Sequence, residues 1–337
     1  GDFVHVLNTN LWNRTDVVFL DSMVNLNEKE LITRTGEKVE TQRLYDGRWA
    51  FVAENIPALS SEVYQIVSKK KSSRRFVSMI AENKILNNGI VRVEIDEVKG
   101  TISSFKRVGD SYEYASNSGL NDYLYTGRYA SDPQGIEQIL NIRVLDDGAV
   151  AATLRIESKA PGCNTLWRDV TVYKGIDRVD ICNTLDKQDI LDFENVRFVF
   201  PFNIQQPEIT MDLAMSEIHP EREQLEGVNK HYYSLQNGLA VGDLEHAVCL
   251  TTVDAPFVEL GSPSGLDYRL NPRHGYGWWQ SAKISPIVYS WVMTNTWRTN
   301  YKASQGGTAK FRYSLQPCNP LDLKLKQRGA EREMELV

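Results

Sequence analysis

The chain has 337 residues, of which 42% are hydrophobic and 24% charged, a composition typical of soluble globular proteins. Its formal net charge of −6 argues against nucleic acid or an acidic membrane surface as a partner. No apolar run approaches the roughly 18 residues of a membrane-spanning helix, and the length predicts one to three domains.

The first 66 residues contain several strand-like segments, namely FVHVLNT, DVVFLD, LITRTGEKVETQRL and EVYQIV. These segments predict a small β-sandwich-like domain over residues 1–70. A basic, serine-containing run, SKKKSSRR, then interrupts the apolar pattern. We interpret residues 71–82 as a solvated linker, with a basic ligand patch as the alternative.

Alternation of apolar and polar residues dominates the chain after this run and indicates strands. A strand is expected at Asn83–Ile95, and in GIVRVEIDEVKGTISSF the pair Lys99-Gly100 predicts a turn. In WRDVTVYKGIDRVDIC the pair Lys174-Gly175 predicts the tip of a hairpin, because glycine accepts the positive φ of such turns. VRFVFPFNI and HAVCLTTV are further strand candidates, with Pro201 at a strand end or edge.

Together these segments predict an all-β fold in which a large antiparallel two-sheet sandwich over residues 83–320 follows the small β domain. Residues 321–337, rich in Lys, Glu and Arg, predict a C-terminal tail that is either a short helix or frayed.

The stretch YSWVMTNTWRTNYKASQGGTAKFRYSL near the C-terminal end predicts a core hairpin. Alternation places Tyr289, Trp291 and Met293 on one face of its first strand, and QGG supplies the turn. The predicted tip, Asn295 to Tyr301, combines polar and aromatic residues that suit contact with a sugar or with another domain. Its candidate contact residues are Asn295, Trp297 and Asn300.

Residues for metal or nucleophilic chemistry do not form recognisable patterns. The five histidines lack metal-ligand spacing, and no nucleophile elbow or phosphate loop occurs. Asp177 and Asp180 are interpreted as surface charges. The four cysteines are expected to be buried thiols, with one disulfide as the alternative: Cys163, Cys182, Cys249 and Cys318.

Two aromatic clusters have the means to bind sugar, because a flat ring stacks on a pyranose while Asn, Asp and Arg bind its hydroxyls. GLNDYLYTGRY supplies Asp122, Tyr123, Tyr125 and Arg128. NPRHGYGWW supplies Arg273, His274, Tyr276, Trp278 and Trp279. Packing in the core or in loops is the alternative for both clusters, and a surface salt bridge is the alternative for Arg128.

Several stretches, in order along nearly the whole chain, resemble the region that follows the catalytic domain in bacterial members of glycoside hydrolase family 38, the α-mannosidases. They include VHVLNTNLWNRTDVV, ENKILNNGIVRVEIDEVKGTISSFKR and VMTNTWRTNYKASQGGTAKFRYSLQP. ENIPALSSEVYQIV is similar too, but Ser60-Ser61 stand where the family has glycine.

The resemblance implies a galactose-mutarotase-like supersandwich and a parent enzyme that hydrolyses α-mannosides with retention. In the family the zinc ligands and the nucleophilic Asp belong to an N-terminal domain that nothing here matches. We therefore expect a non-catalytic β portion with no catalytic residue, metal site or cofactor of its own, and zinc in the missing domain. Its expected partners are an α-mannoside and the N-terminal catalytic domain of the same protein.

A family Tyr from a Gly-x-Tyr-Leu-Phe loop reaches the active site, and NDYLY places Tyr123 at that position, although Asn-Asp precedes it here. The alternatives are an autonomous carbohydrate-binding module that uses Tyr123 and Trp278-Trp279, and a mutarotase-like sugar epimerase with His246 or His274. The compartment stays open between periplasm and cytoplasm. Because the chain opens with Gly1, we expect the natural protein to begin upstream.

Overall fold

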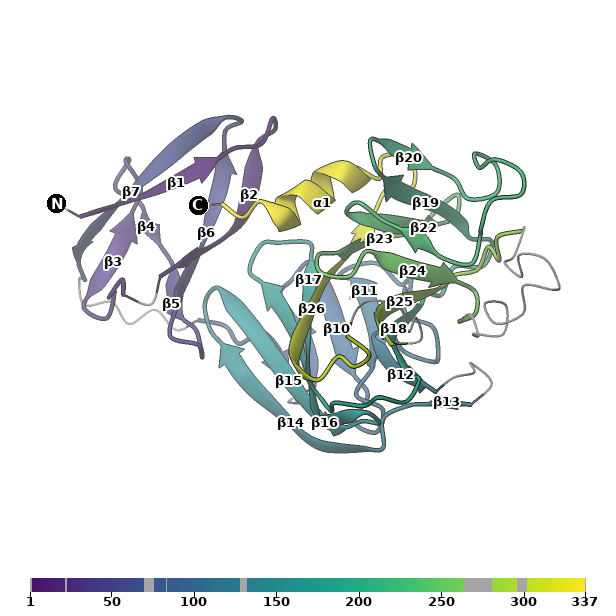
Figure 1. Cartoon of the computed structure of the whole chain (residues 1–337). Coiled ribbons are helices and arrows are strands. Elements are labelled where there is room, and N and C mark those ends of the chain that lie inside the picture. The colour runs from purple at the N-terminus through teal and green to yellow at the C-terminus, as the bar shows by residue number, and fades with distance from the viewer. Residues whose placement is uncertain are drawn as a thin grey trace.

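The computed structural model describes residues 2–21, 23–69, 76–82, 84–127, 132–263, 281–295 and 302–336. Within them the chain forms five antiparallel sheets and one helix, which confirms the predicted all-β class (Figure 1). The helix has nine residues, and no helix of the described chain is long and apolar enough to cross a membrane.

Residues 3–68, which we call the first section, form two small sheets that face each other. One has the order β1 (Phe3–Asn8), β7 (Ser60–Ser68), β3 (Lys29–Ile32) and β4 (Lys38–Val39). The other has the order β2 (Arg14–Leu20), β6 (Trp49–Ile56) and β5 (Thr41–Arg43). Their inward side chains share one core that includes Val6, Val18, Leu31, Phe51 and Tyr64.

A nine-stranded sheet is the larger layer of the large sandwich. Its order is β14 (Gln138–Asp147), β15 (Ala151–Lys159), β16 (Cys163–Tyr173), β17 (Val179–Lys187), β26 (Gly307–Cys318), β23 (Ala247–Thr252), β22 (Gly238–Gly242), β19 (Glu208–Leu213) and β20 (Ser216–Ile218).

The opposite layer is divided into two sheets. A six-stranded sheet has the order β13 (Pro133–Gln134), β12 (Asp122–Thr126), β18 (Asn195–Pro201), β25 (Ile287–Thr294), β24 (Phe257–Leu260) and β21 (Tyr233–Ser234). A four-stranded sheet has the order β11 (Ile102–Arg107), β10 (Val91–Ile95), β9 (Ile85–Asn87) and β8 (Ile80–Ala81). One apolar cluster joins both to the nine-stranded sheet, as expected for a sandwich, and includes Val93, Phe105, Leu154, Val170, Phe198 and Tyr313.

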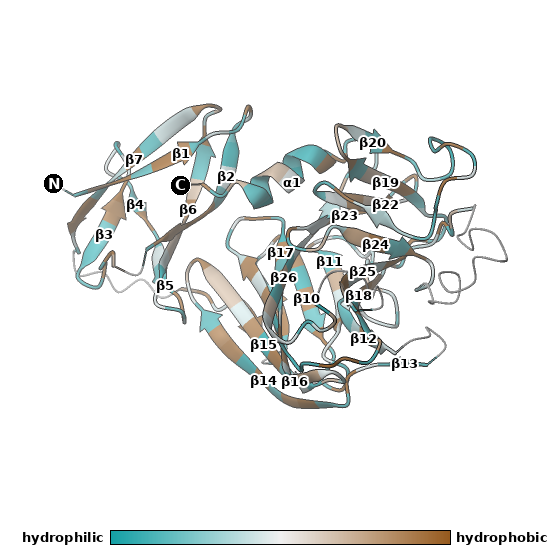
Figure 2. Cartoon of the chain, in the orientation of Figure 1, coloured by the Kyte–Doolittle hydropathy of each residue, from teal (hydrophilic) through white to brown (hydrophobic). Residues whose placement is uncertain are grey.

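The local strand predictions are confirmed where a turn glycine sets the pairing. Strands β16 and β17 pair from Val172 opposite Val179, and Gly175 at the tip has φ +73°. Strands β10 and β11 pair likewise across a turn in which Gly100 has φ +64°. Figure 2 shows hydrophobic and hydrophilic residues alternating along many of these strands. The strand predicted at Asn83–Ile95 is instead two strands, β9 and β10.

The hairpin predicted near the C-terminal end is wrong. Strand β25 pairs with β18 and β24 in the six-stranded sheet, whereas β26 pairs with β17 and β23 in the nine-stranded sheet. A bulge in β25 also separates Trp291, opposite Arg197, from Met293, opposite Val196, so Met293 packs against the main core. The chain therefore crosses from one layer to the other between these strands.

Helix α1 (Leu325–Glu333) and the residues after it join the first section to the large sandwich (Figure 1). The indole Nε1 of Trp12 donates to Glu331 at 2.7 Å, and Arg14 donates to the carbonyl oxygen of Met334 at 2.6 Å. Leu336 enters the core of the first section. Of the two alternatives for this segment, the structure shows the helix.

Charged residues are buried where the first section meets the large sandwich. Arg178 donates to Asp16 at 2.9 Å and to Asp180 at 2.8 Å, and Arg332 lies 3.3 Å from Asp180. The surface position predicted for Asp180 is thus wrong, because its carboxylate contacts two guanidinium groups instead of solvent. Asp177 remains partly exposed and pairs with Arg107 at 3.7 Å.

All four cysteines are free thiols, and three of them are buried as expected, whereas Cys182 is half-buried. The Sγ atoms of Cys249 and Cys318, on neighbouring strands β23 and β26, lie 3.3 Å apart without a bond.

Candidate functional site

Two strands, β12 and β25, adjoin the segments predicted to contact sugar. They end at the same end of the six-stranded sheet. Thr126 at the end of β12 pairs with Asn195, and Asn195 pairs with Thr294 at the end of β25. We call this the β12–β25 end. Arg128, Trp297 and Asn300 follow these strands directly but lie outside the described residues.

Tyr123 is a core residue rather than an exposed ring. It is 1% exposed, pairs with Phe198 on β18 and packs edge-to-face on that ring. Its hydroxyl donates to the carbonyl oxygen of Pro161 at 2.6 Å. Burial, reinforced by Cys163, raises the pKa of Tyr123 well above its usual value. In this structure the ring is not available to a ligand, because the strand register turns it inward.

Asp122 and Tyr125 are half-buried on the same strand. Asp122 accepts a hydrogen bond from the backbone N–H of Tyr123 at 2.9 Å, and burial raises its pKa against the attraction of Arg168. Burial and the neighbouring Glu194 carboxylate raise the pKa of Tyr125. Of the predicted residues that the structure describes, Asp122 and Tyr125 are therefore the two that retain partial exposure.

Asn295 anchors a loop. It is 2% exposed, and its Nδ2 donates to the carbonyl oxygens of Ile190 and Asp192 at 3.1 and 2.7 Å. Its Oδ1 accepts from the backbone N–H of Glu194 at 2.7 Å. The side-chain amide therefore makes its hydrogen bonds with residues 190–194 and holds this loop against the end of β25. A sugar contact by Asn295 stays a prediction.

An ion pair that sequence reasoning missed lies beneath the β12–β25 end. Lys187 Nζ donates to Glu194 Oε1 at 2.7 Å, with the two side chains 0% and 4% exposed. Glu194 Oε2 has no hydrogen-bond partner among the described residues, and it lies beside Gly162, where a Cβ would come within 3.2 Å of it. Glu194 is therefore a buried carboxylate that is paired with Lys187 and closed off from solvent. The sequence signal was a carboxylate directly before the strand Asn195–Pro201.

A second buried pair lies in the six-stranded sheet. The cluster NPRHGYGWW, residues 271–279, is outside the described residues. Arg197 Nε donates to Glu259 Oε2 at 2.5 Å, and both side chains are fully buried. The Arg197 guanidinium also lies over the Trp291 ring, 4.5 Å from its centroid. The sequence signal for this pair was a charged residue, Arg197, between Val196 and Phe198 in a strand that reads as buried.

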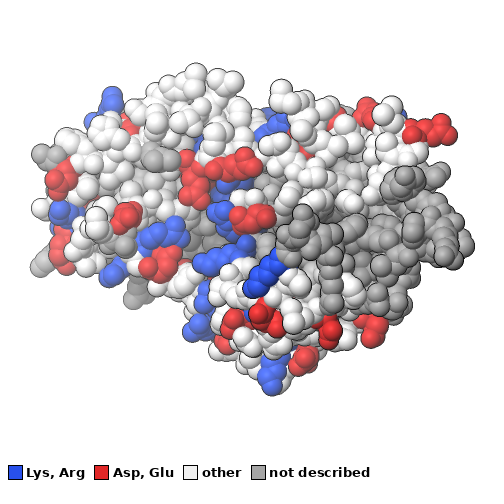
Figure 3. Space-filling view, in the orientation of Figure 1, with Lys and Arg blue, Asp and Glu red and all other residues white. Residues whose placement is uncertain are grey.

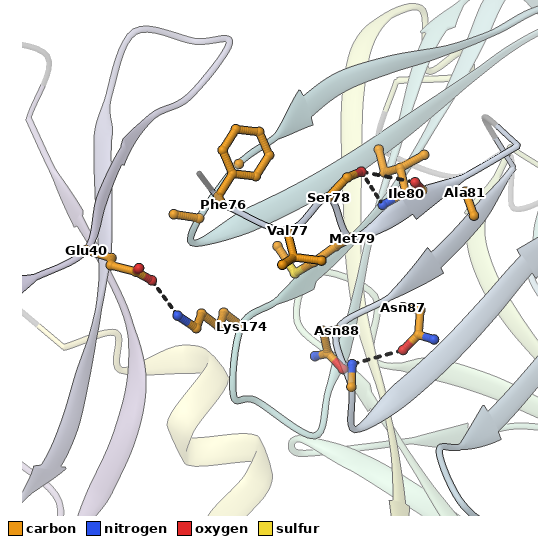
Figure 4. Close-up of a pocket in the computed structure, with 13 residues that line it drawn as sticks. Glu40, Phe76, Val77, Ser78, Met79, Ile80, Ala81, Asn87, Asn88 and Lys174 are labelled. Carbon is orange, nitrogen blue, oxygen red and sulfur yellow. Dashed lines mark hydrogen bonds and ion pairs between the residues drawn. The ribbon is translucent and has the colours of Figure 1, made fainter. Parts of the chain in front are cut away.

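A cavity of about 580 Å³ lies where the first section meets the start of the large sandwich (Figure 4). Phe76, Val77 and Met79 line it, together with the ion pair of Glu40 and Lys174. Asn88 in its wall donates to Tyr173 and Ile176 carbonyl oxygens and accepts from the Ile90 and Val91 amides, so its side chain is fully used. This cavity therefore marks the boundary between the first section and the large sandwich.

Among the described residues, no group of three or more His, Cys, Asp or Glu could hold a metal ion. These residues therefore do not fit the zinc site of the family resemblance, and no zinc chemistry is assigned to them.

His246 lies in the turn between β22 and β23. Its ring stacks on Tyr112 at 3.5 Å and 5°, and its Nδ1 is 3.8 Å from Asp243 Oδ1 within the same turn. This is a packing arrangement and not a cleft with a facing acid, so it does not favour the epimerase alternative. His274 lies outside the described residues.

The fold matches solved structures along almost the whole chain. It superimposes on an α-mannosidase from Enterococcus faecalis V583 with a TM-score of 0.73 and 12% identity, covering 99% of this chain and 45% of that one. A protein in glycosyl hydrolase family 38 from Enterococcus faecalis gives a TM-score of 0.71 at 12% identity, covering 99% and 46%. A galactose mutarotase-like protein from Lactobacillus casei ATCC 334 gives 0.41 at 13%, covering 72% and 100%.

No protein-family model matches the sequence, and no curated protein matches it. At these identities the likeness shows the fold: the chain shares the architecture of slightly less than half of each of the two Enterococcus structures.

Proposed function

We propose that this chain is the non-catalytic β portion of an α-mannosidase-like glycoside hydrolase whose parent reaction is retaining hydrolysis of α-mannosides. The observation that carries the proposal is the match of 99% of the chain, in one superposition, to 45% of an α-mannosidase. The ordered sequence motifs support it independently. Zinc and the catalytic carboxylates would then belong to the other half of the enzyme.

Within that enzyme the β portion would brace the catalytic domain and lend sugar contacts at the β12–β25 end. The buried pair of Lys187 and Glu194 and the amide of Asn295 support this role, because they fix the strand ends from which those contacts would project. Asp122 and Tyr125 are the described residues placed to contribute, with Arg128, Trp297 and Asn300 as candidates in the adjoining segments.

The first test is an activity assay on the purified chain with 4-nitrophenyl α-mannoside, with and without added Zn²⁺. We expect no turnover above the rate of the uncatalysed reaction. Zinc-dependent turnover by the chain alone would overturn the proposal.

The second test is the coding sequence upstream of Gly1. We expect a domain of several hundred residues that carries His and Asp zinc ligands. An unrelated domain there would contradict an α-mannosidase parent even if the first assay shows no activity.

A further inference from the structure

The outward face of the nine-stranded sheet carries a row of side chains that crosses five strands. Strand register places Asn141 opposite Glu157, Glu157 opposite Trp167, Trp167 opposite Thr184, and Thr184 opposite Lys310. We call these five residues the Trp167 row. At about 4.8 Å between strands, the row is about 19 Å wide. Trp167 is its only aromatic member and is half-buried.

The next row on the same face is strongly charged, and two of its three arginines are paired with carboxylates. It runs through Arg143, Arg155, Asp169, Cys182 and Arg312 in register. Arg155 holds Asp169 with two hydrogen bonds of 2.7 Å, and Arg312 holds Asp254 with hydrogen bonds of 2.9 Å. This row therefore offers many hydrogen-bonding groups with little unbalanced charge.

A cleft of about 480 Å³ lies between this face and the first section. Asp169, Arg312 and Lys310 line its sheet side, and Tyr45, which is 53% exposed, lines its first-section side. Figure 3 shows positive and negative side chains gathered together in the middle of the molecule, between its two parts. Since Lys310 lines the cleft and is also the last member of the Trp167 row, the cleft borders one end of that row.

Some polar groups of the Trp167 row and of the cleft have no partner among the described residues. The indole N–H of Trp167, beside the cleft, and the ammonium of Lys310, which lines it, have no hydrogen-bond or ion-pair partner there. Arg332, whose side chain is only 10% exposed, lines the cleft with an Nε that has no hydrogen-bond partner in the described chain. Of these three donors the Arg332 Nε is buried, and buried donors without partners are rare in proteins.

We propose that this face binds a neutral oligosaccharide, with Trp167 stacked on one sugar ring and Asp169, Lys310 and Arg332 at its hydroxyls. An anion would require a net positive surface, whereas acidic side chains outnumber basic ones in the lining of this cleft. A neutral polyol matches a dense set of donors and acceptors beside one flat ring. The cleft volume of about 480 Å³ lies within the roughly 300–1,000 Å³ of small-ligand sites. This site lies on the opposite layer from the β12–β25 end and does not depend on the proposed function.

The test is isothermal titration calorimetry of the purified chain with four neutral trisaccharides: α-mannotriose, cellotriose, chitotriose and xylotriose. We expect at least one to bind with a Kd of about 0.1–1 mM. Trp167→Ala should weaken that binding about tenfold, whereas Trp167→Phe, which keeps a stacking ring, should stay within about threefold. Lys310→Ala should weaken it a few-fold.

Tyr232→Ala is the matched control, because Tyr232 is also a half-buried aromatic residue but packs on Trp291 of the six-stranded sheet. It should leave binding unchanged, and a thermal unfolding midpoint for each variant verifies folding. If any of the four sugars binds and Trp167→Ala weakens that binding, the site is supported. If that sugar contains no mannose, the result counts against the α-mannosidase parent but not against this face. No binding of any trisaccharide at about 10 mM, or equal binding by Trp167→Ala, overturns the proposal.

Discussion

Asp16 of the first section and Arg178 of the large sandwich form an ion pair of 2.9 Å with side chains only 7% and 4% exposed. Arg14 completes the pairing of Asp16, and Asp180 completes that of Arg178. An apolar contact that includes Val17, Val150 and Tyr173 surrounds them. The two parts of the chain are therefore joined by an interface that resembles a protein interior.

Removing one partner of this pair should destabilise the protein strongly. Asp16→Asn leaves Arg178 and Arg14 short of a counter-charge in a buried position, and we expect a loss of about 3–5 kcal/mol in the free energy of unfolding. Urea denaturation measures this. The control is Asp177→Asn, in a half-exposed pair with Arg107, which should cost less than about 1 kcal/mol. Equal effects for the two variants would contradict the structural role of Asp16.

The same carboxylate should make stability depend on pH. Burial alone would raise the pKa of Asp16, but the charges and hydrogen bonds of Arg178 and Arg14 outweigh it and lower the pKa below 3.8. A lowered folded-state pKa means that the stabilisation is present above pH 3.8 and is lost as pH falls through the folded-state value. We expect the midpoint temperature of thermal unfolding to decrease as the pH is lowered below about 4. This decrease should be less steep in Asp16→Asn. Equal slopes of unfolding midpoint against pH in the wild type and in Asp16→Asn would contradict this prediction.

The pair of Lys187 and Glu194 should be essential to the β12–β25 end. Lys187→Met leaves an unpaired buried carboxylate and should cost about 3–5 kcal/mol. Replacing both residues, Lys187→Met with Glu194→Leu, removes that charge, so the double variant should be more stable than Lys187→Met alone. Chemical denaturation of the single and double variants compares them. A double variant less stable than Lys187→Met would show that the pair itself, and not its charge balance, is required.

Gly100 should tolerate no side chain. Its φ is +64°, and a Cβ there would lie 2.2 Å from a guanidinium nitrogen of the fully buried Arg168. Gly175 has a similar φ of +73° but open space around it, so Gly175→Ala should cost only about 1 kcal/mol. We expect Gly100→Ala to cost at least about 2 kcal/mol more, since packed neighbours must move. Thermal unfolding of both variants gives the difference.

Tyr123 should behave as a core residue in every assay. Tyr123→Phe removes the hydrogen bond to Pro161 and should cost about 1 kcal/mol of stability. It should not change the affinity of the chain for any trisaccharide, because the ring is buried. A loss of sugar affinity with unchanged stability would restore the family-based role of this residue.

Sequence patterns predicted those parts of the fold that neighbouring residues determine. The hairpin around Gly175 follows from local alternation and one turn glycine. The route from β25 to β26 does not, because alternation shows that both strands are half-buried but not which sheet each joins. Pairing of β26 with β17 and β23 depends on residues more than 60 positions away, and no local signal encodes it.

The site residues divide in the same way. Tyr123 was predicted as a contact from a motif, yet its direction depends on the register of β12 against β18. Trp167, by contrast, lies in the stretch WRDVTVY, and period-two alternation already places it on one face with Asp169 and Thr171. The sequence does not predict which distant residues lie beside that face. These are Tyr45 from the first section and Lys310 from β26.

Leu336, which packs with Val6, Phe51 and Tyr64, has a consequence for biosynthesis. A ribosome that adds about 5–20 residues per second makes strands β1–β7 tens of seconds before this leucine. The core of the first section therefore stays incomplete until Leu336 has been synthesised. A nascent chain stalled before Leu336 would expose apolar surface in the first section, where a chaperone or protease could bind it.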